Sequence, residues 1–136
     1  MMNHCLFCEI NNGNIPCYKI YEDRETLVFL DVAEDVDGHM LAVPKKHCAG
    51  ILDCDADTLH ALMNTVKKVS EHMVNHCGYD GVNLLHAAGN SAGQSVGHFH
   101  IHIIPRKSGD GINAWPTMEH HQNTLEEMQK LLEMRR

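Results

Sequence analysis

Residues 97–106 read Gly-His-Phe-His-Ile-His-Ile-Ile-Pro-Arg, and the histidines at 98, 100 and 102 alternate with apolar residues. Such alternation is typical of a β-strand, where successive side chains point to opposite faces. We therefore predict a strand over 97–104 with three imidazoles on one face. Rings on that face stand roughly 7 Å apart, so one ring can contact a phosphate-sized group while the next stays within hydrogen-bonding reach.

A small polar loop, Gly-Asn-Ser-Ala-Gly-Gln-Ser, lies directly upstream at 89–95. Its backbone N–H groups can face an anion. A lone strand histidine is usually an ordinary polar residue, but three in register beside such a loop indicate a chemical site.

The 136 residues fit a single domain, 1–136, that is large enough to fold without disulfides. The net charge of −7 argues against nonspecific binding to nucleic acid or an anionic membrane. Residues 1–9 do not read as a secretory leader, and no apolar run approaches the ~20 residues that span a bilayer. We expect a cytoplasmic protein whose six cysteines are reduced or metal-bound.

The remaining pattern predicts an α+β fold. Short apolar runs separated by polar turns indicate antiparallel strands, and apolar residues at helical spacing indicate a central helix. A capping box at Thr124 and Glu127 begins a short C-terminal helix. The expected strands are 17–20, 26–31, 39–43, 81–85 and 97–104, and the expected central helix is 57–75. The domain core is expected over about residues 5–105, followed by a tail over 106–136.

This chain resembles the histidine triad (HIT) superfamily. Residues 98–104 match the His-x-His-x-His-apolar-apolar signature, and Gly93-Gln94-Ser95-Val96 precedes it as in the Hint-like phosphoramidase branch. Residues 29–32 (Phe-Leu-Asp-Val) resemble the nucleoside-binding strand of that family, and 38–47 resemble its next strand with a Pro-Lys-x-His end. The resemblance covers about residues 5–105 in the family's order, and it implies a HIT-like fold.

The resemblance implies covalent catalysis by His100. Its ring nitrogen would attack the α-phosphorus of a purine nucleoside phosphoramidate, a nucleotidyl ester or a dinucleotide polyphosphate, and water would then release the monophosphate. A neutral imidazole is a competent nucleophile near neutral pH, provided that its other nitrogen is held as N–H. No catalytic metal is required.

The resemblance also assigns supporting roles. His102 would bind phosphate oxygens, His98 completes the triad, His39 would support the triad through a hydrogen bond, and Ser95 with Gln94 would hold the leaving side. The expected catalytic residues are His98, His100, His102, His39 and Ser95, and the expected nucleotide-binding residues are Phe29, Asp31, Val32, Gly93, Gln94, Ser95, His100 and His102. One departure is Ala87, which stands where the family usually has Asn, so one contact to the nucleotide or triad is missing.

A second constellation is Cys5-x-x-Cys8, with His47 and His98 as candidate partners. Two thiolates and two imidazoles make a closed tetrahedral set for structural zinc. The resemblance supports zinc, because several bacterial HIT proteins place it on a matching set. The alternatives are a redox pair, which lacks a thioredoxin-like βαβ context here, and two buried thiols.

Two other function classes compete with a metal-free hydrolase. One is a metal-dependent hydrolase that uses His-x-His as zinc ligands. The other is a catalytically weak module that binds nucleotide or a partner protein. The resemblance further implies a homodimer, for which we expect Leu62, Val66 and Val69 on the central helix to form the contact.

Overall fold

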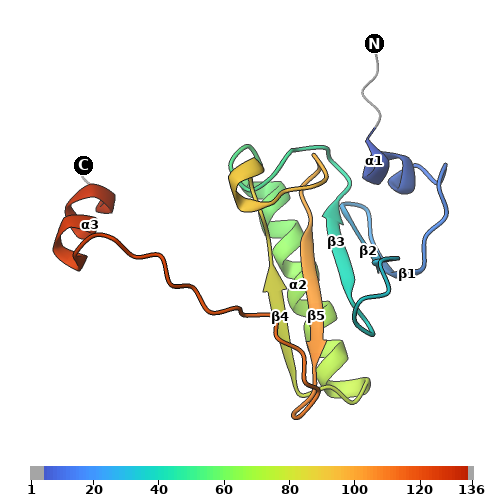
Figure 1. Cartoon of the computed structure of the whole chain (residues 1–136). Helices are drawn as coiled ribbons and strands as arrows, with labels where there is room; N and C mark the ends of the chain where they lie inside the picture. The colour runs from blue at the N-terminus through green and yellow to red at the C-terminus, as the bar shows by residue number, and fades with distance from the viewer. Residues whose placement is uncertain (1–4, 135–136) are drawn as a thin grey trace.

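A computed structural model describes residues 5–134 of the chain. Its centre is one five-stranded antiparallel sheet with the spatial order β1-β2-β3-β5-β4 (Figure 1). The elements in chain order are α1 (Leu6–Asn11), β1 (Lys19–Glu22), β2 (Thr26–Leu30), β3 (Met40–Pro44), α2 (Ala56–His76), β4 (Gly81–Leu85), the 3₁₀ turn η1 (Asn90–Ala92), β5 (Ile101–Arg106) and α3 (Leu125–Leu132). The predicted α+β class, the antiparallel sheet and both predicted helices are confirmed.

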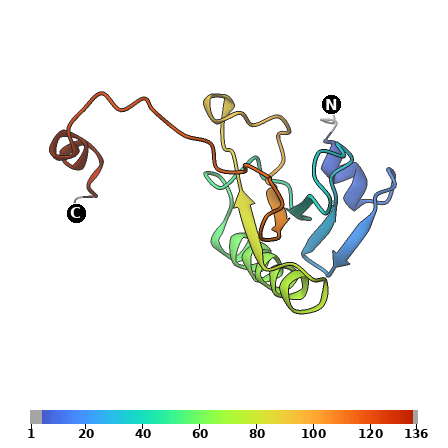
Figure 2. The ribbon, with the colours of Figure 1, turned by 60° about the horizontal axis from the view of Figure 1, so that its bottom comes forward.

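The long helix α2 covers one face of the sheet, as Figure 2 shows from below. Its buried residues Leu62, Val66, Val69 and Met73 recur at helical spacing and form one core with apolar residues of β2, β3 and β5. This position corrects our expectation for the dimer contact. Leu62, Val66 and Val69 are at most 3% exposed and pack on their own sheet, so they offer no surface to a second chain.

The short helix α1 covers the opposite face, and no sequence pattern predicted it. Phe7 is its buried residue, and it packs with Leu27 and Phe29 of β2 and Leu41 and Val43 of β3. Because both faces are covered, β2 and β3 are almost continuously buried rather than half exposed. The sheet edge near α1 therefore becomes a suitable place for a pocket.

Strand β5 begins at Ile101, four residues later than predicted. In the preceding segment the Phe99 N–H donates to the Cys48 carbonyl oxygen at 2.7 Å, outside the sheet ladder. The predicted alternation nevertheless holds. Phe99, Ile101 and Ile103 join the core under α2, whereas the rings of His98 and His100 contact Phe7 on the other side.

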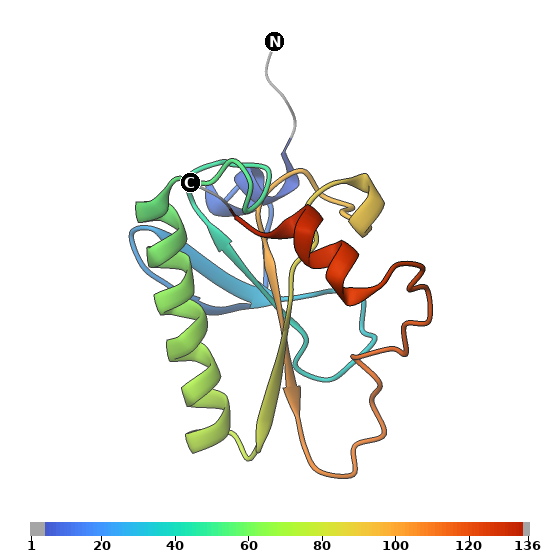
Figure 3. The same cartoon turned by 90° about the vertical axis from the view of Figure 1, so that its left-hand side faces the viewer.

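The C-terminal helix α3 stands apart from the sheet (Figures 1 and 2), and in Figure 3 it lies in front of the sheet along the line of view. Its predicted capping box is present, with the Thr124 hydroxyl accepting from the Glu127 N–H at 3.1 Å and the Glu127 carboxylate accepting from the Thr124 N–H at 2.9 Å. Its leucines are exposed. None of the helices within residues 5–134 combines the length and apolar character that a membrane span needs.

Candidate active site

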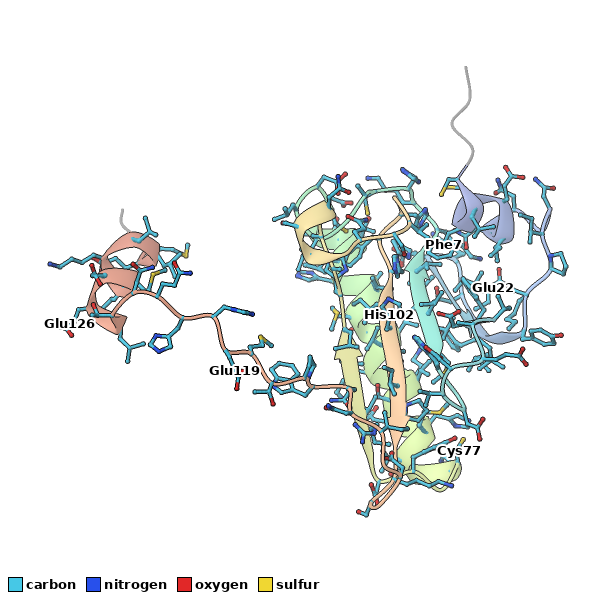
Figure 4. All side chains as sticks on the ribbon, viewed as in Figure 1. Phe7, Glu22, Cys77, His102, Glu119 and Glu126 are labelled. Carbon is cyan, nitrogen blue, oxygen red and sulfur yellow. The ribbon has the colours of Figure 1, made fainter. Side chains whose placement is uncertain are left out.

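A cavity of about 330 Å³ opens between α1, the end of β2 and the start of β5. Apolar side chains form most of its wall, and Asp31, Ser95, His100 and His102 supply carboxylate, hydroxyl and imidazole groups, with the Cys17 thiol beside them. Figure 4 labels Phe7 and His102, which reach the cavity from α1 and β5. A largely apolar wall with few polar groups is typical of a small-molecule site.

The ring of His100 is held in one tautomer. Its Nδ1 lies 2.7 Å from the carbonyl oxygen of His98, so Nδ1 carries the proton and donates it. The second nitrogen, Nε2, is therefore left with a lone pair. Phe7 packs edge-on against the ring with 5.2 Å between ring centroids, and the residue is only 6% exposed. His100 thus has the properties of an oriented nucleophile on a pocket wall.

His102 is the end of a chain of hydrogen bonds. Its Nδ1 lies 2.8 Å from Nε2 of His39, and Nδ1 of His39 lies 2.9 Å from the Asp35 carboxylate. The His39 imidazole holds the pKa of Asp35 below its usual value. Burial, followed by the charges of His100 and His39, lowers the pKa of His102. The hydrogen-bonded chain thus runs from the Asp35 carboxylate through His39 to His102 at the cavity wall, and a proton can move along it.

The four predicted metal ligands lie together beside the pocket. The Nδ1 atom of His98 is 3.3 Å from Cys5 Sγ, 3.5 Å from Cys8 Sγ and 3.1 Å from His47 Nδ1. All four ligand atoms lie within 4.8 Å of one another. Burial and the neighbouring Cys5 thiol raise the pKa of Cys8 to about 11.

This cluster fits a tetrahedral zinc ion by its donor chemistry. The His98 Nε2–H donates to the Pro44 carbonyl oxygen at 2.8 Å, which leaves Nδ1 unprotonated and directed at the thiols. Two sulfurs and two nitrogens fill all four positions of such an ion. The site is therefore structural in character, with no open position for substrate.

The polar loop before the triad is braced by Gln94. Its amide oxygen accepts from the Gly89 N–H at 2.8 Å, and its NH₂ group donates to the carbonyl oxygens of Ala49 and Val96 at 2.7 and 2.9 Å. Ser95 lines the cavity, but Gly93 and Gln94 do not. The Gln94 amide therefore joins its own loop to the backbone at Ala49, and its expected role at the leaving side stays a prediction. Phe29, Asp31 and Val32 line the cavity as the sequence suggested.

Three functional neighbours were missed by the sequence reading. They are Phe7, Asp35 and His86. His86 directly precedes Ala87; its Nδ1 lies 3.1 Å from the His100 carbonyl oxygen, and its Nε2 accepts from the Ile51 N–H at 3.3 Å. A carboxylate four residues before His39 was the available signal for Asp35, whereas the contacts of Phe7 and His86 depend on tertiary packing alone.

Comparison with known proteins agrees with this geometry. The HIT domain pattern matches residues 12–109. The chain belongs to the HIT domain family. A relative from Methanocaldococcus jannaschii, an uncharacterized HIT-like protein, is 45% identical over 107 residues, which are 79% of this chain and 82% of the relative.

Other HIT relatives connect the family to chemistry and structure. The adenosine 5′-monophosphoramidase hnt1 of Schizosaccharomyces pombe is 37% identical over 116 residues, 83% of this chain and 84% of that protein. The crystal structure of SMU.412c from Streptococcus mutans matches with a TM-score of 0.83 at 32% identity, covering 96% of this chain and 82% of that one. A zinc-bound histidine triad family protein of Mycobacterium smegmatis matches with a TM-score of 0.76 at 30% identity, covering 85% of this chain and 84% of that one. The predicted family and fold are thus confirmed, and nucleotide hydrolysis is the general activity that these relatives support.

Proposed function

We propose that this HIT protein is a nucleotide phosphoramidase that acts through a covalent nucleotidyl-His100. The observation that carries the proposal is the His100 ring, whose Nδ1–H is held by the His98 carbonyl oxygen while the ring lines the cavity. An oriented neutral imidazole is activated without a metal. The phosphoramidase from S. pombe supports the choice of substrate class.

The proposed reaction has two displacements at one phosphorus. In the first, His100 Nε2 forms a bond to the α-phosphorus of a purine nucleoside phosphoramidate as the P–N bond breaks, and the leaving amine takes a proton through the Ser95 hydroxyl. In the second, water attacks the same phosphorus and the P–Nε2 bond breaks. The proton that water loses returns to the Ser95 side of the pocket, and the nucleoside monophosphate leaves. Nucleotidyl esters and dinucleotide polyphosphates offer the same α-phosphorus.

The other pocket residues each contact a different part of the substrate. His102 donates to phosphate oxygens when the chain through His39 supplies a proton, and the Ser95 hydroxyl serves the leaving side. Phe29 and Val32 contact base or sugar, and Asp31 accepts from the ribose hydroxyls. The loop braced by Gln94 contributes Ser95 and Val96 to the cavity wall, whereas the Gly93 N–H donates to the Asn90 carbonyl oxygen at 3.0 Å.

The direct test is release of AMP from adenosine 5′-phosphoramidate, compared with its 2′-deoxy analogue. We expect turnover of both, with a preference of roughly tenfold for the ribose form, because a hydrogen bond to a charged group contributes about 1.5–3 kcal/mol. Asp31→Asn should reduce this preference, while Asp37→Asn, a carboxylate in the next turn, serves as the matched control. Equal rates for both sugars in the unaltered protein would remove Asp31 from this role.

The same assay separates the two competing functions. A catalytically weak binding module would bind AMP but release none from the phosphoramidate. A metal-dependent hydrolase on His-x-His requires His100 and His102 to hold one ion, yet neither His-rich cluster found within residues 5–134 includes His100. Turnover that survives chelation of all metal would exclude that alternative.

We also propose that Cys5, Cys8, His47 and His98 bind one structural zinc ion. The four donor atoms lie within 4.8 Å of one another, two thiols and two imidazoles are a common zinc ligand set, and the related M. smegmatis protein is zinc-bound. Elemental analysis should give one zinc per chain. The six cysteines are all unpaired, in keeping with the proposed cytoplasmic setting.

We propose a homodimer formed at the β4 edge of the sheet. Within residues 5–134, strand β4 pairs with β5 alone, and Leu84 on β4 is 43% exposed. Met63 and Val74 of α2 are 40% and 41% exposed. Light scattering should give twice the 15.3 kDa chain mass. Leu84→Glu should produce monomers, whereas Leu52→Glu, in the exposed loop before α2, should not. A monomer at micromolar concentration would contradict the proposal.

A further inference from the structure

A second group of metal-ligating side chains lies on the pocket wall, apart from the cysteine cluster. It consists of Asp31, His39 and His102, whose donor atoms lie within 4.8 Å of one another. We propose that these three residues bind a divalent transition-metal ion, and that this ion inhibits the enzyme. The inhibitory part rests on the proposed function, whereas the binding part does not.

The spacing of the donor atoms suits a single ion. His39 Nε2 lies 2.8 Å from His102 Nδ1 and 3.7 Å from Asp31 Oδ2. Nitrogen and oxygen ligands about 2.0–2.2 Å from a tetrahedral zinc ion are themselves roughly 3.3–3.6 Å apart. Small ring and carboxylate rotations therefore bring all three donors to one centre. Two imidazoles and one carboxylate are a ligand set that leaves coordination positions open.

Neighbouring groups already orient two of the ligands. The Asp35 carboxylate accepts from Nδ1 of His39 at 2.9 Å, which directs the Nε2 lone pair of His39 toward the centre. A carboxylate behind a ligating histidine is a recurrent support of metal sites, because it fixes the tautomer and increases basicity. The Ala33 N–H donates to Asp31 Oδ1 at 2.9 Å, which leaves Oδ2 facing His39.

The open positions of this ion would face the substrate cavity. Asp31 and His102 both line that cavity, and His39 lies behind them at 8% exposure. The metal thus has access from solvent, and water can complete its coordination. The site differs from the cysteine cluster, which is closed by four protein ligands of which two are sulfur.

Metal binding here is incompatible with the proposed roles of the same atoms. Coordination uses the Nε2 lone pair of His39, which otherwise accepts from the Nδ1–H of His102, and it requires that Nδ1 to give up its proton. The Asp35 to His102 chain is therefore interrupted. It also occupies the Asp31 carboxylate proposed to hold the ribose. Nucleotide and metal therefore compete for the pocket, and the ion lowers the rate without entering the chemistry.

Titration with Co²⁺ tests the binding directly, starting from full-length protein that carries one zinc per chain. We expect one further equivalent to bind with d–d absorption but without the sulfur-to-cobalt charge-transfer band of a thiolate site. Asp31→Asn should weaken this binding at least tenfold, while Asp37→Asn should leave it unchanged. Circular dichroism of the variants checks that both are folded.

The second arm of the experiment follows AMP release during the same titration. We expect activity to fall as the second equivalent binds, and AMP to displace the ion. Binding of no further equivalent, a thiolate band on the second ion, or equal affinity in Asp31→Asn overturns the metal site. Binding with the rate unchanged overturns the inhibition. Absence of turnover in metal-free buffer contradicts the proposed function but leaves the absorption titration to decide the site.

Discussion

His98 and His100 are two residues apart and both are buried, yet they present opposite ring nitrogens. His98 donates from Nε2 to the Pro44 carbonyl oxygen and directs Nδ1 at the cysteine thiols. His100 donates from Nδ1 to the His98 carbonyl oxygen and keeps its Nε2 lone pair for the cavity. One ring faces a closed ligand cluster and the other an open pocket.

This contrast shows that the nearest backbone carbonyl decides the chemistry of each histidine. A carbonyl that accepts from one ring nitrogen fixes the tautomer and so selects which lone pair is available. His98 serves both regions, because its side chain faces the thiols while its backbone orients His100. The metal cluster and the pocket should therefore respond differently to substitution.

The largest effect is expected for His100→Asn, which removes the proposed nucleophile. The rate of AMP release should fall at least about 1,000-fold, as when the attacking group of a covalent enzyme is lost. The Kd for AMP, measured by calorimetry, should change less than about threefold, because the pocket wall is otherwise intact. A variant that keeps near-normal turnover would end the covalent mechanism.

Removing the metal should mainly affect stability. Zinc present at one hundred times its Kd adds about 2.7 kcal/mol to the free energy of unfolding. For a chain of this size that loss lowers Tm by roughly 10 °C. Chelation and Cys8→Ser should both show this decrease by calorimetry, with residual activity below the new Tm, while the exposed Cys77 replaced by Ser serves as control. Unchanged Tm after proven metal loss contradicts a structural zinc.

A smaller effect is expected when the support of His39 is weakened. Asp35→Asn keeps an acceptor near Nδ1 of His39 but removes the carboxylate charge. We expect kcat to fall about tenfold, in the range found when the outer hydrogen-bond partner of a working histidine is lost. Asp37→Asn is the matched control. If both variants behave alike, the chain from Asp35 to His102 has no part in turnover.

The smallest effect on rate separates the two roles of His98. His98→Cys retains a zinc ligand, because three cysteines and one histidine are also a common structural set, and it retains the backbone carbonyl. AMP release should stay within about threefold of normal and zinc should remain bound. A loss as large as that of His100→Asn would show that the His98 ring itself takes part in the reaction.

Much of the fold was predictable because the strand and helices follow from the local spacing of apolar residues. The two-residue alternation at 98–103 predicted which side chains face α2, and the helical spacing of α2 and the capping box of α3 predicted both helices. The pattern could not show that β5 begins only at Ile101. Pairing with β3 stops at Ala42 and Ile101 although β3 continues to Pro44, because the Phe99 N–H donates to the distant Cys48 carbonyl oxygen.

Contacts made across long sequence distances were not predictable in the same way. The hydrogen bond from the Gln94 amide to the Ala49 carbonyl oxygen joins residues 45 positions apart, which no local pattern reports. Leu62, Val66 and Val69 were expected at a dimer contact, although an apolar stripe does not reveal whether it packs on its own sheet or on another chain. The tertiary fold alone brings the Phe7 ring against His100 and the His86 ring to the His100 carbonyl oxygen.

The most direct test of the central claim is to trap the nucleotidyl group. The protein is mixed briefly with adenosine 5′-phosphoramidate, quenched under denaturing alkaline conditions that preserve P–N bonds, digested and mapped by mass spectrometry. The account predicts an added AMP moiety on the peptide that contains His100, with fragmentation placing it on that ring, and none in His100→Asn. An adduct on another residue, or AMP release with no adduct at any mixing time shorter than one turnover, would contradict it.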